Sequence, residues 1–300
     1  MKFNTSYNKI ITDETLMETI QHGERDYPFH FYYDNLALYD FHCVEWHWHT
    51  EFEFVFVNSG TVFFGIGEKQ FSLPAGSGVF INSKVLHRYY SDEEAIVPNF
   101  VFMPDYIAVQ NSLIYKKYIL PVLSSSLDYQ VFAPEIPWQA EVLAVMKEII
   151  YVQEAESGIE LITSSLVQRM WDLLYRNVNA RPIRENNGSS IASQGRLQLM
   201  MQYIHQQFSM NISLEDIAGH AMVSKSTTLN LFRKYLHITP INYLINYRLQ
   251  EAAKLLSSTE RKIHVISKEV GFESVDYFCK AFKKYYSMTP TEYRKNRDRQ

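Results

Sequence analysis

The sequence predicts a two-domain protein, in which an all-β barrel domain with flanking helices precedes an all-α domain. Three observations lead to this fold class. Short apolar runs separated by turn signals fill residues 28–104, as in an antiparallel sandwich or small barrel. After about Pro137 the apolar residues recur every three and four positions, which is typical of amphipathic helices. Beyond residue 196 a pattern of two short helices occurs twice.

Composition and length restrict the class of protein. The chain has 300 residues, of which 46% are hydrophobic, so it can form a substantial core. Its two cysteines, Cys43 and Cys279, are too few and too far apart for a disulfide framework or a cysteine-rich zinc site. No apolar run approaches the roughly 20 residues that span a bilayer, and the first residues do not form a signal peptide. We therefore expect a cytoplasmic protein with no membrane partner.

The net charge of -4 conceals an asymmetry along the chain. Residues 1–190 contain 13 Lys and Arg against 24 Asp and Glu, whereas residues 191–300 contain 16 against 9, which gives -11 followed by +7. A basic segment attached to an acidic one suggests a polyanion partner for the second part, because Lys and Arg release the counterions condensed on phosphates. A merely solvated basic face is the alternative, and charge alone favours neither.

The β domain is expected over residues 1–136, and one strand candidate in it carries an unusual set of side chains. In VEWHWHTEFEFVFV, Trp46 begins an aromatic face and His47 begins the opposite, polar face. The aromatic face contains Trp46, Trp48, Phe52, Phe54 and Phe56, and the polar face contains His47, His49, Glu51 and Glu53. If this strand lines a barrel, its histidines and glutamates point into a pocket.

Two amphipathic helices are expected in residues 137–178, followed by a linker. The helices have one apolar side each, which could cover the open side of the β domain as a lid or form a dimer seam. Residues 179–195 are rich in Asn, Arg, Pro, Gly and Ser and lack apolar periodicity, so we interpret them as an interdomain linker.

The all-α domain is expected over residues 196–300, and it contains a duplication. Helix starts are indicated by Ser213, Ser224 and Ser274, each of which can cap a following helix. Some fifty residues separate the two copies, and Ile217, Val223, Phe232, Tyr235, Thr239 and Pro240 correspond to Ile266, Phe272, Phe282, Tyr285, Thr289 and Pro290. This pattern predicts a duplicated helix-turn-helix unit.

The second helix of each unit is the candidate for contact with DNA. An α-helix fits the major groove, so such a helix needs a polar outer face over an apolar inner one. A helix bundle with solvated basic faces is the alternative, but a repeat within a segment of charge +7 favours double-stranded DNA as the partner. The candidate residues are Lys225, Ser226, Thr227, Asn230 and Arg233 in the first unit, and Ser274, Val275, Cys279, Lys280, Lys283 and Lys284 in the second.

The stretch IHVISKEVGFESVDYFCKAFKKYYSMTPTEYRKN resembles the C-terminal signature of the AraC (AraC/XylS) family of transcription regulators. The resemblance covers residues 196–295. It implies two helix-turn-helix units joined by a long helix over residues 238–258, RNA polymerase as a partner, and a role as an activator. The sequence departs from the family at Asn230, where an arginine is usual, and at Ser287, where glycine is usual because the helix cap there is left-handed.

The polar face of the β domain resembles a second known pattern. The spacing His47-x-His49-x3-Glu53-x6-Gly60 is similar to the first motif of the cupin family, and His87 fits the second motif. The proline, glycine and asparagine expected there are replaced by Asn82, Lys84 and Ser91. AraC-type regulators often have a cupin-like sensor domain. The two resemblances together imply an all-β cupin-like barrel with flanking helices, followed by an all-α double helix-turn-helix.

Three roles are open for the polar set in this domain. It can line an effector pocket, be satisfied structural residues, or bind a metal ion through three imidazoles and a carboxylate. We expect the first role and no cofactor. The expected effector-binding residues are Trp46, His47, His49, Glu53 and His87, and the last four are also the weaker metal candidates. With Tyr32, Tyr33, Trp46 and Trp48 as an aromatic wall, a sugar is the suggested effector.

Together these features predict a sequence-specific transcription regulator that is not an enzyme. A small-molecule effector would control it from the N-terminal domain, and it would act as a homodimer. The alternative is a metal-dependent cupin enzyme with a DNA-binding appendage. The residues at Asn82, Lys84 and Ser91 argue against that alternative.

Overall fold

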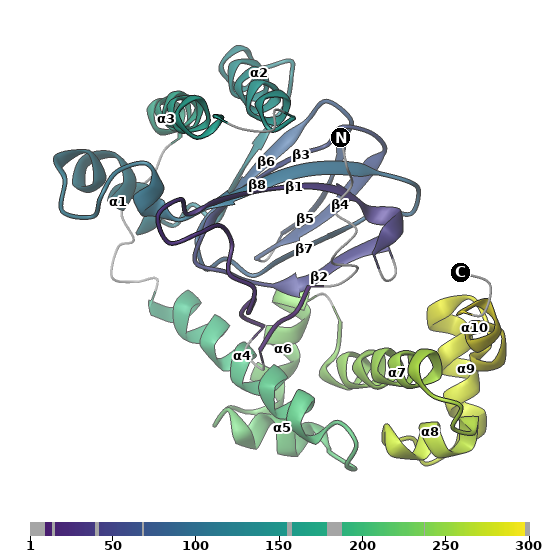
Figure 1. Cartoon of the computed structure of the whole chain (residues 1–300). Coiled ribbons are helices and arrows are strands. Elements are labelled where there is room, and N and C mark those ends of the chain that lie inside the picture. Colours follow the sequence, from purple (N-terminus) through teal and green to yellow (C-terminus); the bar gives the residue numbers. More distant parts are fainter. Residues whose placement is uncertain are drawn as a thin grey trace. The chain divides into compact units, whose positions relative to one another are not determined.

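A computed structural model of the chain shows two compact units, Met1–Asn187 and Gly188–Gln300, which are described separately (Figure 1). No helix in the part of the chain that the structure describes is long and apolar enough to cross a membrane. The described residues are 10–13, 16–39, 42–67, 69–154, 158–178, 188–236 and 238–297.

The first unit contains two antiparallel sheets that face each other, which confirms the predicted β fold (Figure 1). Among the described residues no strand belongs to both sheets, so the barrel is not closed. The five-stranded sheet has the order β1 (Phe29–Asn35), β8 (Ile96–Phe102), β3 (Phe52–Phe56), β6 (Gly78–Ile81) and β9 (Tyr129–Phe132). The four-stranded sheet has the order β2 (Cys43–His47), β7 (His87–Tyr90), β4 (Thr61–Ile66) and β5 (Lys69–Pro74).

The five-stranded sheet buries both of its faces. Alternate residues of a strand point to opposite faces, so Phe52, Phe54 and Phe56 of β3 lie on one side while Glu53 and Val55 lie on the other. The side of Val55 faces the second sheet and is filled by valines, leucines and isoleucines from both sheets. The opposite side is a phenylalanine surface to which all five strands contribute.

Helices cover the phenylalanine surface. They are α2 (Pro137–Val152), α3 (Glu160–Asn177), and the turns η4 (Tyr115–Ile119) and α1 (Leu120–Leu123). The ring of Trp171 in α3 stacks on Phe52 with 4.7 Å between centroids, and its indole nitrogen donates to the carbonyl of Tyr118 at 3.0 Å. The two helices predicted within residues 137–178 are therefore present, and they cover one face of a sheet. Two short 3-10 turns, η1 (Leu36–Leu38) and η3 (Pro104–Tyr106), complete the unit.

The prediction of a single strand through VEWHWHTEFEFVFV is wrong. The chain leaves the four-stranded sheet after His47 and enters the five-stranded sheet at Phe52, so the segment is two strands in different sheets. Hydrogen bonds from the connection between β6 and β7 help to hold the crossing: the amide of Lys84 donates to the carbonyl of His49 at 2.8 Å, and the hydroxyl of Ser83 donates to the carbonyl of Thr50 at 2.7 Å. The polar alternation continues across the break, which is why the sequence pattern did not reveal it.

The second unit is helical. Its elements are α4 (Gly188–Gln207), α5 (Leu214–His220), α6 (Lys225–Leu236), α7 (Pro240–Ser258), α8 (Ile263–Glu269), α9 (Val275–Tyr286) and α10 (Pro290–Arg297). Helix α4 begins at Gly188, before Arg196, where the domain was expected to start, and the sequence between these two residues contains no proline that would prevent helix formation. Of the expected linker, residues 179–187 lie outside the described part of the chain.

The predicted duplication corresponds to the helix pairs α5–α6 and α8–α9. Ser213 and Asp216 form a reciprocal capping box at the start of α5. The hydroxyls of Ser224 and Ser274 accept from backbone amides at the starts of α6 and α9, at 3.1 Å and 3.3 Å. All three predicted helix starts are thus confirmed, and the long connecting helix expected over residues 238–258 is α7.

Three turns in this unit have a left-handed backbone. Gly271, in the turn between α8 and α9, has φ of 89°, and Met222 has φ of 52° in the corresponding turn of the first copy. Ser287, which ends α9, has φ of 56°. Residues other than glycine are strained in this region because Cβ approaches the carbonyl oxygen. The sequence-based expectation of strain at Ser287 agrees with this backbone.

Replacing Ser287 with glycine should stabilise the second unit. Ser287→Gly removes the left-handed strain, so we expect the free energy of unfolding to rise by about 1 kcal/mol. Ser257→Gly, within α7, makes the same chemical change in regular helix and should lower the free energy by roughly 0.5 kcal/mol. Denaturant unfolding of the two variants measures both values. Equal effects of the two substitutions would contradict the assignment of strain to Ser287.

Candidate functional site

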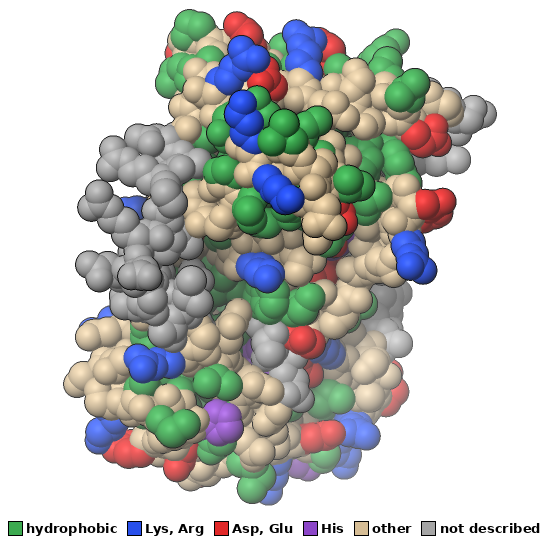
Figure 2. All heavy atoms as spheres, turned by 90° about the vertical axis from the view of Figure 1, so that its left-hand side faces the viewer, with side chains coloured by type: hydrophobic (Ala, Val, Ile, Leu, Met, Phe, Trp, Pro, Cys, Tyr) green, Lys and Arg blue, Asp and Glu red, His purple; other side chains and the backbone are tan. Residues whose placement is uncertain are grey.

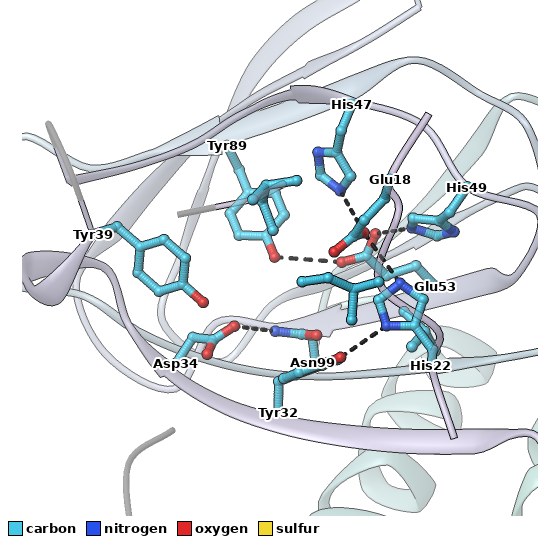
Figure 3. A pocket seen from close by; sticks show the side chains of 13 residues that line it. Glu18, His22, Tyr32, Asp34, Tyr39, His47, His49, Glu53, Tyr89 and Asn99 are labelled. Carbon is cyan, nitrogen blue, oxygen red and sulfur yellow. Dashed lines mark hydrogen bonds and ion pairs between the residues drawn. The ribbon is translucent and has the colours of Figure 1, made fainter. Parts of the chain in front are cut away.

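A buried pocket lies between the two sheets of the first unit (Figure 3). Its wall comes from both sheets and from the segment that precedes β1. Most of the lining is polar, which is unusual for the interior of a β sandwich. The polar lining residues are Glu18, His22, Tyr32, Asp34, Tyr39, His47, His49, Glu53, Tyr89 and Asn99.

The crossing between the sheets brings three of these side chains together. His47 ends β2, Glu53 lies near the start of β3, and His49 lies in the connecting segment. His49 Nε2 is 3.3 Å from Glu53 Oε2. Because the chain changes sheet between them, His47 and Glu53 project into the interior from opposite walls.

His87 completes a cluster of three imidazoles and one carboxylate. It begins β7 and is the register partner of His47, with 4.1 Å between the ring centroids. Its Nε2 lies 2.8 Å from Glu53 Oε2. One ligand atom from each of His47, His49, Glu53 and His87 lies within 4.8 Å of the others, and all four residues are buried. These four side chains could hold a metal ion.

The segment before β1 contributes two residues that the sequence did not reveal. The amide of Glu18 donates to the carbonyl of Trp48, and the amide of Trp48 donates to the carbonyl of Leu16, both at 2.9 Å. This places Glu18 Oε2 3.8 Å from His47 Nε2 and 3.1 Å from His22 Nε2. No local pattern marks Glu18 or His22, since their contacts are with residues distant in sequence.

The buried charges compensate one another. Burial raises the pKa of Glu53, but His87 and His49 outweigh burial and hold that pKa well below its usual range. Burial also opposes the charge of His87, yet Glu53 raises the pKa of this histidine. His22 and Glu18 form a second pair of the same kind. Burial, and then the charge of His87, lowers the pKa of His47 to about 3, so His47 is neutral at pH 7.

The opposite end of the pocket has a different chemistry. The side-chain amide of Asn99 in β8 donates to Asp34 Oδ2 in β1 at 2.9 Å, and Tyr39 lies beside this pair in Figure 3. Burial raises the pKa of Asp34 to about 6. A sequence signal for this pair does exist: Asp34 and Asn99 are polar residues at inward positions of strands that are otherwise mostly aromatic or aliphatic.

The structure brings together four of the five expected effector-binding residues. His47, His49 and Glu53 line the pocket, and His87 contacts Glu53. Trp46 does not line this pocket, in contrast to His47, His49 and Glu53. Adjacent residues of a strand point to opposite faces, and the Trp46 ring lies against Gly65, with the guanidinium of Arg88 5.8 Å from its centroid. Of the suggested aromatic wall, Tyr32 lines the pocket.

The candidate DNA-contacting residues are arranged on α6 and α9, which begin at equivalent positions of the two copies. Lys225, Ser226, Asn230 and Arg233 are exposed on α6, and Thr227 is half-buried. Lys280, Lys283 and Lys284 are exposed on α9, with Ser274 at its N-cap, whereas Val275 and Cys279 are half-buried. Lys225 forms an ion pair with Glu215 of α5. Asp276 and Tyr277 are also exposed on α9 but were not predicted as contacts.

Comparisons with known proteins agree with both units. A family described as a helix-turn-helix domain matches residues 217–296, and a family described as an AraC-like ligand binding domain matches residues 37–119. The chain is 29% identical over 295 residues to the uncharacterized transcriptional regulator YdeC of Bacillus subtilis, an alignment that covers 95% of this chain and 98% of YdeC.

Two other relatives are similar over shorter lengths. The melibiose operon regulatory protein of Escherichia coli is 27% identical over 158 residues, which is 53% of this chain and 51% of that protein. A solved structure of an AraC-type transcriptional regulator from Chromobacterium violaceum is 30% identical, with a TM-score of 0.34, and covers 36% of this chain and 96% of that one.

The fold and the matched domains define a DNA-binding transcription regulator with a ligand-binding domain. The chain combines a helix-turn-helix domain with an AraC-like ligand-binding domain, and the full-length protein to which it is similar is a transcription regulator. The expected family resemblance is thereby confirmed. The alternative of an enzyme with a DNA-binding appendage receives no support, because the relatives are transcription regulators.

The buried carboxyl of Asp34 should make stability depend on pH. Its folded-state pKa of about 6 lies above the ordinary 3.8, so between these values the folded state binds more protons than the unfolded state. Stability due to this group is therefore lost as pH rises from about 4 to 7, by roughly 3 kcal/mol. In Asp34→Asn this loss should be absent, whereas Asp92→Asn, at an exposed site, should retain it. Denaturant unfolding at several pH values measures the difference, and parallel profiles of wild type and Asp34→Asn would contradict it.

Proposed function

We propose that this protein is a sequence-specific transcription activator, controlled by a small-molecule effector that binds between the two sheets. The two helix-turn-helix units would bind successive major grooves of double-stranded DNA, and the protein would recruit RNA polymerase in the cytoplasm. A dimer of the chain would span two half-sites of the DNA. Binding of the effector would change the relative placement of the DNA-binding domains of the two chains.

The observation that carries the proposal is the equivalence of α6 and α9. Both are preceded by a capping serine, both bury an aromatic residue, Phe232 or Phe282, and both expose polar side chains along the opposite face. Asn230 and Lys280 occupy equivalent exposed positions in the two helices. Asparagine and lysine are among the side chains that recognise base edges in the major groove.

Full-length protein should prefer the DNA upstream of its own gene over a scrambled duplex by about 100-fold or more. Affinity should fall steeply with salt, because each phosphate contact releases a counterion. Lys280→Ala should weaken binding to the upstream DNA by roughly 10-fold, while Lys69→Ala, which removes the same charge from β5, should not. Titrations monitored by fluorescence anisotropy measure these affinities. Equal affinity for both duplexes, or equal effects of the two variants, would contradict specific reading by α9.

The chemistry of the pocket supports a polyhydroxylated effector such as a sugar. Tyr32, Tyr39 and Tyr89 provide rings and hydroxyls, and Asp34 and Asn99 provide an acceptor and a donor. The space available to the centre of a water-sized molecule is about 30 Å³, which corresponds to about two water molecules. A sugar would therefore enter only if residues 16–22, which contribute Glu18 and His22, moved away from the sheets.

A panel of mono- and disaccharides should contain at least one that raises the melting temperature of the protein. A ligand that binds only the folded state stabilises it by about 2.7 kcal/mol at 100 times its dissociation constant. Differential scanning fluorimetry measures the shift, and Asp34→Asn should reduce it. No shift at millimolar concentrations of any sugar would exclude this class of effector and leave the DNA-binding proposal intact.

Exposed apolar residues on the helical side of the first unit support a dimer interface. Turn η4 packs against α3, with Tyr118 and Tyr175 in edge-to-face contact. On the same helical side, Leu113, which precedes η4, and Leu161, in the first turn of α3, are 76% and 84% exposed. Figure 2 shows hydrophobic side chains exposed on the corresponding face. Contiguous exposed apolar surface is a feature of protein interfaces.

Charged residues at these positions should dissociate the dimer. The double variant Leu113→Lys, Leu161→Lys places charges in the proposed interface, so the sedimentation coefficient should fall to that of a monomer. Leu38→Lys changes an exposed leucine in η1 and should leave the dimer unchanged. Analytical ultracentrifugation measures the oligomeric state. A dimer that persists in the double variant would exclude this surface.

A further inference from the structure

We propose that the pocket binds a divalent transition-metal ion through His47, His49, Glu53 and His87, with Glu18 as a further donor from the segment before β1. The proposal concerns an additional ligand of the first unit. It depends neither on DNA binding nor on the identity of an organic effector. The four side chains form the cluster described above, and the segment carrying Glu18 covers it.

The donor atoms are already close to a coordination geometry. Metal–ligand bonds of zinc are about 2.0–2.2 Å for imidazole nitrogen and carboxylate oxygen, so neighbouring ligands lie about 3–4 Å apart. In the structure one donor from each of the four residues lies within 4.8 Å of the others. Small side-chain rotations would therefore suffice, and the sheets need not move.

Two of the imidazoles are held in the tautomer that a metal requires. The Nδ1–H of His47 donates to the carbonyl of Glu45, and the Nδ1–H of His87 donates to the carbonyl of Val85, both at 2.8 Å. Each hydrogen bond leaves Nε2 directed into the cluster. A hydrogen bond from the second ring nitrogen to a backbone carbonyl is the usual support of a metal-binding histidine.

The hydrogen bonding of the cluster is incomplete. His87 Nε2 and His49 Nδ1 are buried, and neither makes a hydrogen bond. The Nε2 of His87 lies 2.8 Å from Glu53 Oε2, as an ion pair, and the Nδ1 of His49 is 3.6 Å from Glu51. A purely structural cluster would be expected to satisfy its buried polar atoms, because each unsatisfied atom costs roughly 1–3 kcal/mol. A metal ion would provide a partner for them.

The charge and the size of the pocket both favour a metal ion as its occupant. Glu53 and Glu18 are two buried carboxylates, and a divalent cation can replace the positive charges of His87 and His22 in compensating them. The space of about 30 Å³ accommodates an ion without movement of residues 16–22. Three imidazoles with carboxylates suit zinc, nickel, cobalt or iron, whereas calcium and magnesium require oxygen ligands and copper(I) favours sulfur. The set thus selects a divalent transition metal.

The test uses full-length protein stripped of metal with a chelator and then titrated with Co²⁺ or Zn²⁺ alone. We expect one equivalent of metal per chain by elemental analysis, a visible absorption band from bound Co²⁺, and a higher melting temperature. Glu53→Gln should weaken metal binding by more than about 100-fold, and Glu18→Gln by about 10- to 100-fold. Glu24→Gln makes the same change at an exposed site of the same segment and should bind metal as the wild type does.

Less than about a tenth of an equivalent of any transition metal, with no Co²⁺ absorption, would overturn the proposal. Equal affinities of the wild type and Glu53→Gln would also overturn it, because the metal would then be bound elsewhere. Equal losses in Glu18→Gln and Glu24→Gln would remove Glu18 from the set. Since these readouts need no DNA, a chain that binds its upstream duplex but no metal would refute this inference and retain the proposed function.

Discussion

The crossing of the chain from one sheet to the other between His47 and Glu53 is the constraint on which the first unit depends. It brings ionisable side chains into an interior that is otherwise apolar, where an isolated charge would be very unfavourable. The cost is tolerable only because imidazoles and carboxylates compensate one another. Glu53 with His87 and Glu18 with His22 therefore form one electrostatic unit, and removal of one member of either pair leaves an uncompensated charge.

The two faces of the five-stranded sheet have different roles. One face packs against the covering helices, and the other borders the pocket. Phe52 and Phe54 bind the covering helices, while Glu53 between them faces the pocket. A substitution on the phenylalanine face would act through packing, and one on the opposite face would act through charge and hydrogen bonding. The two properties can therefore vary independently within β3.

Sequence patterns could predict those features of the fold that are encoded locally. The periodicity after Pro137 located α2 and α3, and the capping serines located α5, α6 and α9. The spacing of His47, His49, Glu53 and His87 predicted a cluster that the structure shows.

Features that depend on distant contacts were not predictable in this way. The strand break after His47 was hidden because the alternation of polar residues continues through it. Glu18 and His22 reach the pocket through backbone pairing with Trp48, for which the sequence has no marker. Trp46 lies outside the pocket lining, against Gly65, because adjacent residues of a strand point to opposite faces.

Helix α7 connects the two helix-turn-helix units, α5–α6 and α8–α9, and sets the distance between them. Its 19 residues span about 28 Å, close to the roughly 34 Å of one turn of DNA. Because it is a continuous helix, its length fixes both the separation and the angular phase of α6 and α9. One inserted residue would rotate the second helix-turn-helix unit by about 100° around the axis of α7. Under the proposed function, each chain would therefore recognise one spacing of base contacts, and variation in operator geometry would be accommodated between the two chains of the dimer.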